Sequence, residues 1–122
     1  MGLEEQYGIC GQVVEMLRAL AAEPDEQVAF INDFGVGGEP VDELALEFDR
    51  LYGVIRTNPD LAWRYETARP TLDRIDASFA QMSGEQNFEK WTFDALRRSP
   101  EWSELRDLAK TALSQLEESG GS

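Results

Sequence analysis

Apolar residues recur in steps of three and four along most of the chain, and the most regular stretch is residues 40–55. These apolar positions would form one wide stripe on an α-helix: Val41, Leu44, Ala45, Phe48, Leu51, Tyr52 and Ile55. Pro40 suits the first helical position, because its φ is already helical and its missing N–H would have no partner there. Asp42 and Glu43 would follow in the first turn, where the helix dipole favours negative charge. We therefore predict a central core helix over residues 40–55 in which Phe48 is buried.

Helical spacing also precedes this central segment. Residues 3–22 carry one amphipathic pattern, which Glu23-Pro24-Asp25 interrupts. Asp25 is the expected N-cap of a short second helix, because its carboxylate could accept from the backbone N–H groups of the first turn. Gly35 would end that helix, and the glycine-rich residues 35–39 are expected to form a flexible turn.

A further helical pattern runs from Asn58 to Met82 and continues in phase across Pro70. Asn58 is the expected cap and Pro59 the first helical residue. Pro70 removes a backbone donor and disfavours helical geometry at the residue before it. We therefore expect one kinked helix or two nearly collinear helices over this segment.

The remaining residues predict two more helical regions. Residues 85–99 favour one broken helix or two short ones, for which Asn87 and Thr92 are candidate caps. Ser99 and Pro100 repeat the pattern of a cap followed by a proline and begin a final helix. The whole pattern predicts an all-α fold, a single-domain bundle of five or six helices over residues 1–118 with a kinked helix near Pro70. Residues 119–122 are expected to form a disordered tail.

Trp63 lies on the side of its helical pattern opposite to the apolar seam through Leu61, Tyr65 and Ala68. It would belong either to a second packing face or to an exposed anchor for a partner. Burial is the interpretation that the sequence favours, because a helix in a small bundle often packs on two sides.

Negative charge is unevenly divided along the chain, whose net charge is −13. Residues 1–49 hold twelve Asp and Glu but one basic residue, Arg18, whereas the rest holds twelve acids and ten bases. Such acidity repels phosphate backbones and anionic lipids, so we expect no nucleic-acid partner and no membrane partner. A basic protein partner is favoured, and the alternative is that the charge serves only solubility.

The sequence predicts no transmembrane helix, because it contains no run of about 18 apolar residues. Its first residues, MGLEEQYG, carry acids where a signal peptide requires a basic region followed by an apolar one. We therefore expect a cytoplasmic location.

Few residues in this chain are suited to catalysis, since it has no histidine and one cysteine. It cannot build a Ser-His-Asp site, a Cys-His site or a zinc site of the usual composition. Carboxylates remain, and Mg²⁺ can be held between carboxylates on facing helices. Glu43 and Glu47 would be one such pair, and Asp73 and Asp76 the other.

This arrangement loosely resembles that of the helical nucleotide pyrophosphohydrolases, and the resemblance implies a Mg²⁺-dependent enzyme. The chain departs from the family pattern, because Leu46 stands where an acid is wanted and Asp73 where Glu is usual. Asp73 and Asp76 could instead pair with Arg69 and Arg74 on a solvated helix face. We therefore expect no enzyme activity, no cofactor and no metal site, and keep the hydrolase as an alternative.

A binding function is the interpretation that the sequence favours. The expected partner-binding residues are an acidic cluster and one aromatic residue: Asp33, Glu39, Asp42, Glu43, Glu47, Asp49 and Trp63. Like charges four residues apart destabilise an isolated helix, so their presence suits a surface meant for a cationic partner. We expect an acidic protein-binding module, an inhibitor or immunity-type protein that covers a nuclease or another nucleic-acid-binding protein. An adaptor or oligomerisation module is a further alternative.

Overall fold

The computed structural model describes residues 3–33 and 41–118, and over these residues the chain forms helices and turns without any strand. The all-α class is thereby confirmed. The described elements are α1 (Leu3–Ala21), α2 (Pro24–Asn32), α3 (Asp42–Thr57), α4 (Pro59–Ala62), η1 (Trp63–Tyr65), α5 (Arg69–Met82), η2 (Glu85–Trp91), α6 (Phe93–Arg98) and α7 (Pro100–Glu118), where η denotes a 3₁₀ segment. The described residues thus contain seven α-helices where five or six were expected. The expected end of the second helix at Gly35, the turn at 35–39, the start at Pro40 and the tail at 119–122 all lie outside the described residues.

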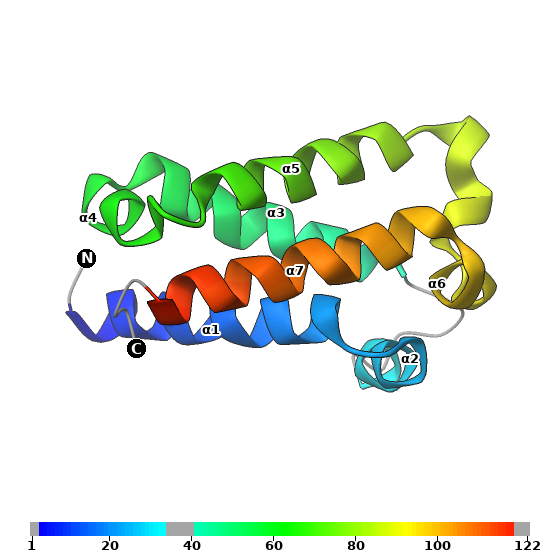
Figure 1. Ribbon diagram of the computed structural model, residues 1–122, viewed down its shortest axis with the longest axis horizontal. Coiled ribbons are helices and arrows are strands. Elements are labelled where there is room, and N and C mark those ends of the chain that lie inside the picture. Colours follow the sequence, from blue (N-terminus) through cyan, green and yellow to red (C-terminus); the bar gives the residue numbers. More distant parts are fainter. Residues whose placement is uncertain (1–2, 34–40, 119–122) are drawn as a thin grey trace.

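Four long helices, α1, α3, α5 and α7, run along the long axis of the molecule (Figure 1). Helix α7 contacts both α1 and α5, and α1 also contacts α3. The short helices lie at the two ends, with α2 against α6 at one end and α4 at the other (Figure 1). The structure is therefore a bundle of long helices closed at each end by short ones.

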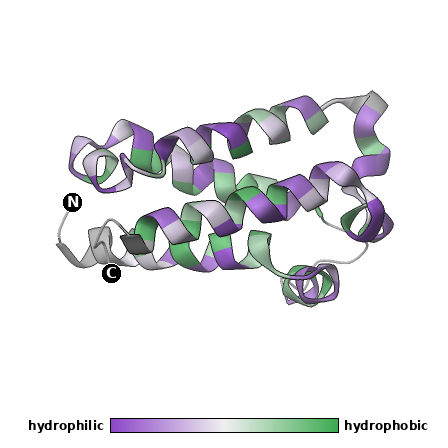
Figure 2. Ribbon diagram, viewed as in Figure 1, coloured by the Kyte–Doolittle hydropathy of each residue, from purple (hydrophilic) through white to green (hydrophobic). Residues whose placement is uncertain are grey.

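The core forms where the apolar stripes of the long helices meet. Figure 2 shows hydrophobic and hydrophilic residues alternating along each long helix, as an amphipathic spacing requires. Phe48 on α3 is 1% exposed, which confirms its predicted burial, and Trp102 on α7 is completely buried. The Phe48 ring lies 5.4 Å from the ring of Tyr52 and 5.7 Å from that of Phe79, so α3 and α5 share an aromatic contact.

The start of α2 differs from the sequence prediction. Pro24 is the first helical residue and Glu23 is the N-cap, without a side-chain cap bond. Asp25 therefore lies inside the first turn, and the prediction that it caps the helix is wrong. Proline is favoured at the first position because its φ is already helical, and it moves the start ahead of Asp25. The Asp25 carboxylate instead pairs with Arg97 of α6, with Nε and Oδ1 3.2 Å apart.

The segment around Pro70 is divided rather than kinked. Asn58 caps α4 as predicted, since its side chain accepts from the backbone N–H of Asp60 at 3.0 Å. Helical geometry then tightens into η1 and a turn, and α5 begins at Arg69 with Pro70 in its first turn. A proline in the first turn needs no intrahelical partner for its missing N–H, so the break falls before it.

Trp63 is 66% exposed, so its predicted burial is wrong. It begins η1, and the Arg64 guanidinium lies 5.7 Å from the centre of its ring. Leu61 and Tyr65 on either side are buried, as predicted. The bundle packs this segment on one face only, which leaves the opposite face to solvent.

Candidate protein-binding groove

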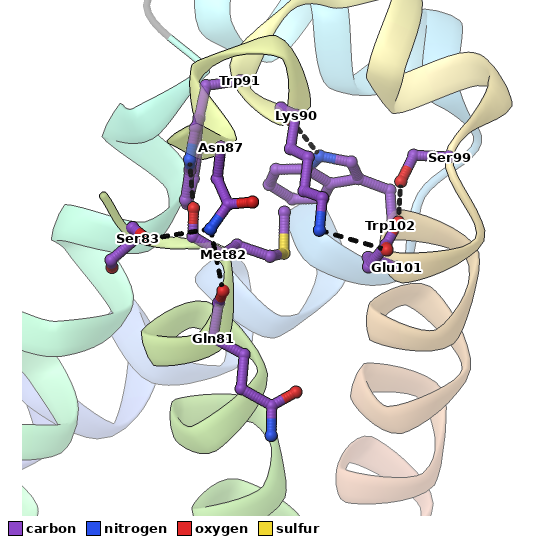
Figure 3. Close-up of polar contacts among 9 residues, drawn as sticks. All are labelled: Gln81, Met82, Ser83, Asn87, Lys90, Trp91, Ser99, Glu101 and Trp102. Carbon is purple, nitrogen blue, oxygen red and sulfur yellow. Dashed lines mark hydrogen bonds and ion pairs between the residues drawn. The ribbon is translucent and has the colours of Figure 1, made fainter. Parts of the chain in front are cut away.

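A hydrogen-bonded structure joins the end of α5, the connection that follows it and the start of α7, and we call it the tryptophan corner: Met82, Asn87, Lys90, Trp91 and Trp102. The Trp91 indole N–H donates to the carbonyl of Met82 at 2.8 Å, and the Trp102 indole N–H donates to the carbonyl of Lys90 at 2.7 Å. The two rings meet edge to face, with centroids 5.7 Å apart. Figure 3 shows the Trp102 indole between the end of α5 and α7, and the Trp91 indole above the end of α5. Each indole thus satisfies its one donor, while the Trp102 ring is buried in the core and the partly buried Trp91 ring packs against that core.

Asn87 fixes the end of α5. Its side-chain amide donates to the carbonyls of Gln81 at 3.1 Å and Ser83 at 3.0 Å, as Figure 3 shows. These carbonyls belong to the end of the helix, where the last C=O groups have no intrahelical partner. Asn87 therefore acts on the preceding helix rather than as the predicted N-cap of the next one. Thr92 does cap α6 as predicted, because its hydroxyl accepts from the backbone N–H of Ala95 at 3.1 Å.

An ion pair closes the outer side of the tryptophan corner. The Lys90 ammonium lies 3.4 Å from Glu101, and the Ser99 hydroxyl donates to the same carboxylate. The Ser99 hydrogen bond is the main cause that lowers the pKa of Glu101 below its ordinary value of 4.5, and Lys90 adds to it. The charged carboxylate is thus favoured in the folded state.

A surface groove lies beside this corner, between α3 and the end of α5. It consists of two adjoining depressions of about 300 and 420 Å³. Phe48, Phe79 and Trp91 line the first depression, and the Phe79 and Trp91 rings stack with centroids 6.1 Å apart. Leu46 and Phe88 line the groove from the surface and are 55% and 68% exposed. The groove therefore has an aromatic lining and two apolar side chains that are exposed to solvent.

The charged groups of this groove all have one sign. Among the described residues, its lining contains three carboxylates, those of Asp42, Asp49 and Asp76, and no Lys or Arg. None of the three has an ion pair with a described residue. We call this surface, made of Leu46, Phe88, Trp91 and the three aspartates, the acidic groove.

The predicted acidic cluster is divided between two sides of α3. Asp42 and Asp49 are seven residues apart, or about two turns, and both line the acidic groove. Glu43 and Glu47 are turned by roughly 100–140° around the helix from Asp42, toward α1. There Glu47 pairs with Arg50 at 2.6 Å, and Arg50 donates to Gln12 of α1 at 2.8 Å.

The other predicted partner-binding residues lie apart from these. Asp33 is exposed directly after α2, and Glu39 lies outside the described residues. Trp63 follows α4, at the opposite end of the molecule from η2, which carries Phe88 (Figure 1). Of the predicted residues that the structure describes, Asp42 and Asp49 are the two that meet at the groove.

The acids of α5 also differ from their expected pairing with arginines. Asp73 accepts a hydrogen bond from the Tyr52 hydroxyl, and Arg74 pairs with Glu104 of α7 at 4.0 Å. Burial, followed by the bond to Asp73, raises the pKa of Tyr52 to about 12. Asp76 lies one turn further along α5 and lines the acidic groove with Asp49.

Sequence reasoning missed Leu46, Asp76, Phe88 and Trp91 as groove residues. Leu46 did carry a signal, because it falls on the polar side of the α3 pattern, between Asp42 and Asp49. Phe88 carried no such signal, because it lies in a short 3₁₀ segment. No amphipathic helical pattern there distinguishes an exposed position from a buried one.

The two carboxylate pairs considered for Mg²⁺ are not brought together. Helix α3 turns Glu43 and Glu47 toward α1, whereas Asp73 bonds to Tyr52 on another side of α3. Within residues 3–33 and 41–118, no three Asp, Glu or Cys side chains form a group that could hold a metal ion.

None of the described helices has the length and apolar character that crossing a membrane requires. Comparison of the chain with models of known protein families, with characterised proteins and with solved structures found no match.

Proposed function

We propose that the protein is a small acidic protein-binding module whose acidic groove receives a basic protein partner. The observation that carries this proposal is the combination of exposed Leu46 and Phe88 with three carboxylates in one groove, whose described lining contains no cation. Protein interfaces typically place an apolar or aromatic anchor at the centre and charged groups at the rim. The concrete form is an inhibitor or immunity-type protein that covers a nuclease or another nucleic-acid-binding protein.

The net charge supports this class of partner. A chain with a net charge of −13 attracts cationic surfaces over long range and repels phosphate groups. A protein that binds nucleic acid offers such a cationic surface, and an acidic protein that covers it competes with the nucleic acid. We expect no catalytic turnover, and an adaptor or oligomerisation role is the alternative that partner identity would distinguish.

The test is the salt dependence of association with a captured partner. The immobilised protein captures partners from lysate at low salt, and association rates are then measured for each purified partner at several salt concentrations. Attraction between opposite charges should raise the association rate, and the rate should fall steeply as salt screens the charges.

Two charge variants sharpen this test. Asp42→Asn with Asp49→Asn and Asp76→Asn should slow association, whereas Glu15→Gln with Glu26→Gln and Asp107→Asn should change it less. The second set removes the same charge from exposed positions on α1, α2 and α7. A captured partner without a basic surface, or an association rate insensitive to salt, would contradict the proposed function.

A further inference from the structure

We infer that the acidic groove binds a single amphipathic cationic helix of the partner. An apolar side chain of that helix would lie between Leu46 and Phe88, and its Lys or Arg side chains would lie beside Asp42, Asp49 and Asp76. This inference rests on the proposed function and adds the chemistry and conformation of the segment that is bound.

The apolar part of the site is built from both walls of the groove. Leu46 extends from α3 and Phe88 from η2, and both keep more than half of their surface in water. Two large apolar side chains that line one depression in this way form a patch, in contrast to the single exposed residues that are normal on any surface. Covering both would remove apolar area from water, which favours binding.

The aromatic lining of the first depression, which Leu46 shares, is ordered by packing and by a hydrogen bond. Phe48 and Phe79 belong to the core, and Trp91 is held by its hydrogen bond to Met82. A site that is already ordered loses little conformational entropy on binding. An apolar side chain from a partner would therefore meet a preformed aromatic surface.

A helix fits this groove better than an extended peptide does. An extended segment gains affinity by adding to the edge of a sheet, and the described residues contain no strand that could receive it. The groove instead lies beside the long helices α3 and α5, which run along the same axis (Figure 1). Asp42 and Asp49 are about 10 Å apart along α3, which equals two turns of an apposed helix. Cations three, four or seven residues apart on that helix would reach them.

The charges select a cationic segment over the other possible occupants. Asp42, Asp49 and Asp76 would repel a phosphorylated or acidic segment. A second copy of this chain is disfavoured as well, because each copy has a net charge of −13. A Lys-rich or Arg-rich face with an apolar stripe is complementary to both features of the groove.

The test uses synthetic peptides as probes. The first has about five helical turns with Leu on one face and Lys on the other, the second has the same residues in scrambled order, and the third has Glu in place of Lys. Isothermal titration calorimetry with the full chain should show that the first binds at least about tenfold more tightly than the second. No binding of the third is expected. Circular dichroism should show a gain of helix when the first peptide binds.

Variants of the full chain locate the binding. Leu46→Ser with Phe88→Ser should lower the affinity for the first peptide by about tenfold or more. Both residues are exposed, so the fold should persist. The variant Asp42→Asn with Asp49→Asn and Asp76→Asn should also lower this affinity and reduce its salt dependence. The control variant Glu15→Gln with Glu26→Gln and Asp107→Asn should change the affinity by less than about threefold. Equal losses from the two charge sets, or equal binding of the scrambled peptide, would overturn the inference.

The same variants separate this inference from the proposed function. If a basic partner binds in a salt-dependent way but is indifferent to the Leu46 and Phe88 substitutions, the proposed function stands and the groove inference is wrong. If the amphipathic peptide binds the groove but captured partners bind without salt dependence, the groove inference stands and the proposed function is wrong. The full chain could instead sediment as a dimer that dissociates when Phe88 is replaced by Ser. That result would assign the groove to a second copy of the chain and overturn the inference.

Discussion

The tryptophan corner and the acidic groove lie on two sides of the same short segment, residues 83–92, and differ in how their polar groups are used. On the inner side, Asn87 and the indoles of Trp91 and Trp102 donate to carbonyls within the chain (Figure 3). On the groove side, Phe88 is exposed and the three aspartates of the acidic groove have no ion pair with a described residue. One side holds the segment in place, and the other is the surface that we propose contacts a partner.

Trp91 belongs to both regions. Its indole N–H is bonded to Met82 in the corner, while its ring stacks on Phe79 and lines the groove. On the proposed function, stability and recognition belong to opposite sides of one segment. Substitutions on the two sides should therefore have separable effects.

The largest effect is expected below the groove, at Phe48. Phe48→Ala should lower the free energy of unfolding by about 3–5 kcal/mol, because it leaves a cavity under the rings of Tyr52 and Phe79. Urea unfolding followed by circular dichroism measures this loss. A loss of less than about 1 kcal/mol would contradict the assignment of α3 as the core helix.

A smaller loss is expected in the tryptophan corner. Trp102→Phe removes the donor to the Lys90 carbonyl and part of the ring volume, so it should cost about 1–3 kcal/mol. Phe88→Ser is the corresponding substitution on the groove side of the same segment. It should change the free energy of unfolding by no more than about 0.5 kcal/mol while weakening peptide binding. If Phe88→Ser destabilises the protein as much as Trp102→Phe, the division between the two sides is wrong.

The ion pair at the outer edge of the corner predicts a modest pH dependence. Because the folded state lowers the pKa of Glu101, the carboxylate stabilises the fold above its ordinary value of 4.5, and this stabilisation is lost as pH falls through the lowered pKa. Glu101→Gln should therefore cost at most about 1 kcal/mol at neutral pH, as expected for a partly exposed pair.

The measurement compares the unfolding free energies of wild-type protein and Glu101→Gln at neutral pH and near pH 3. The difference between them should shrink on acidification. A difference that grows as pH falls would mean that protonating Glu101 stabilises the fold, which is the opposite of the expected coupling.

The smallest effect, none, is expected for divalent metals. Millimolar Mg²⁺ or Mn²⁺ should leave the melting temperature unchanged, because Glu43 and Glu47 lie on a different side of α3 from the contact with Asp73. Thermal unfolding with and without metal provides the measurement. A rise that Glu43→Gln abolishes would favour the hydrolase alternative instead.

Much of the fold could be predicted from the sequence because amphipathic spacing determines which face of a helix is buried. That spacing located α1, α3 and α7 closely, and local hydrogen bonding identified the caps Asn58 and Thr92. It does not determine which neighbour a face packs against. The carboxylates of α3, adjacent in sequence, were therefore expected on one surface, but the helix divides them between two.

The groove was less predictable for a related reason. One wall comes from α3, and the other comes from the end of α5 and from η2. The two exposed apolar residues, Leu46 and Phe88, are about forty residues apart, and no local pattern records that they meet. Trp63 shows the same limit, since the exposure of its face depends on the absence of a packed neighbour among the described residues and not on its own spacing.

The positive φ of Gly84, 106°, has a consequence for how this protein could change over time. A side chain at that position would be strained, so the direction in which the chain leaves α5 depends on a single residue. After that turn, Asn87 and Trp91 bond inward, whereas Phe88 and Glu89 are exposed. Substitution of the two exposed residues leaves these inward bonds in place, and on the proposed function it would change the contact with a partner. If the groove binds a partner as proposed, its specificity can therefore diverge through these two positions without loss of stability.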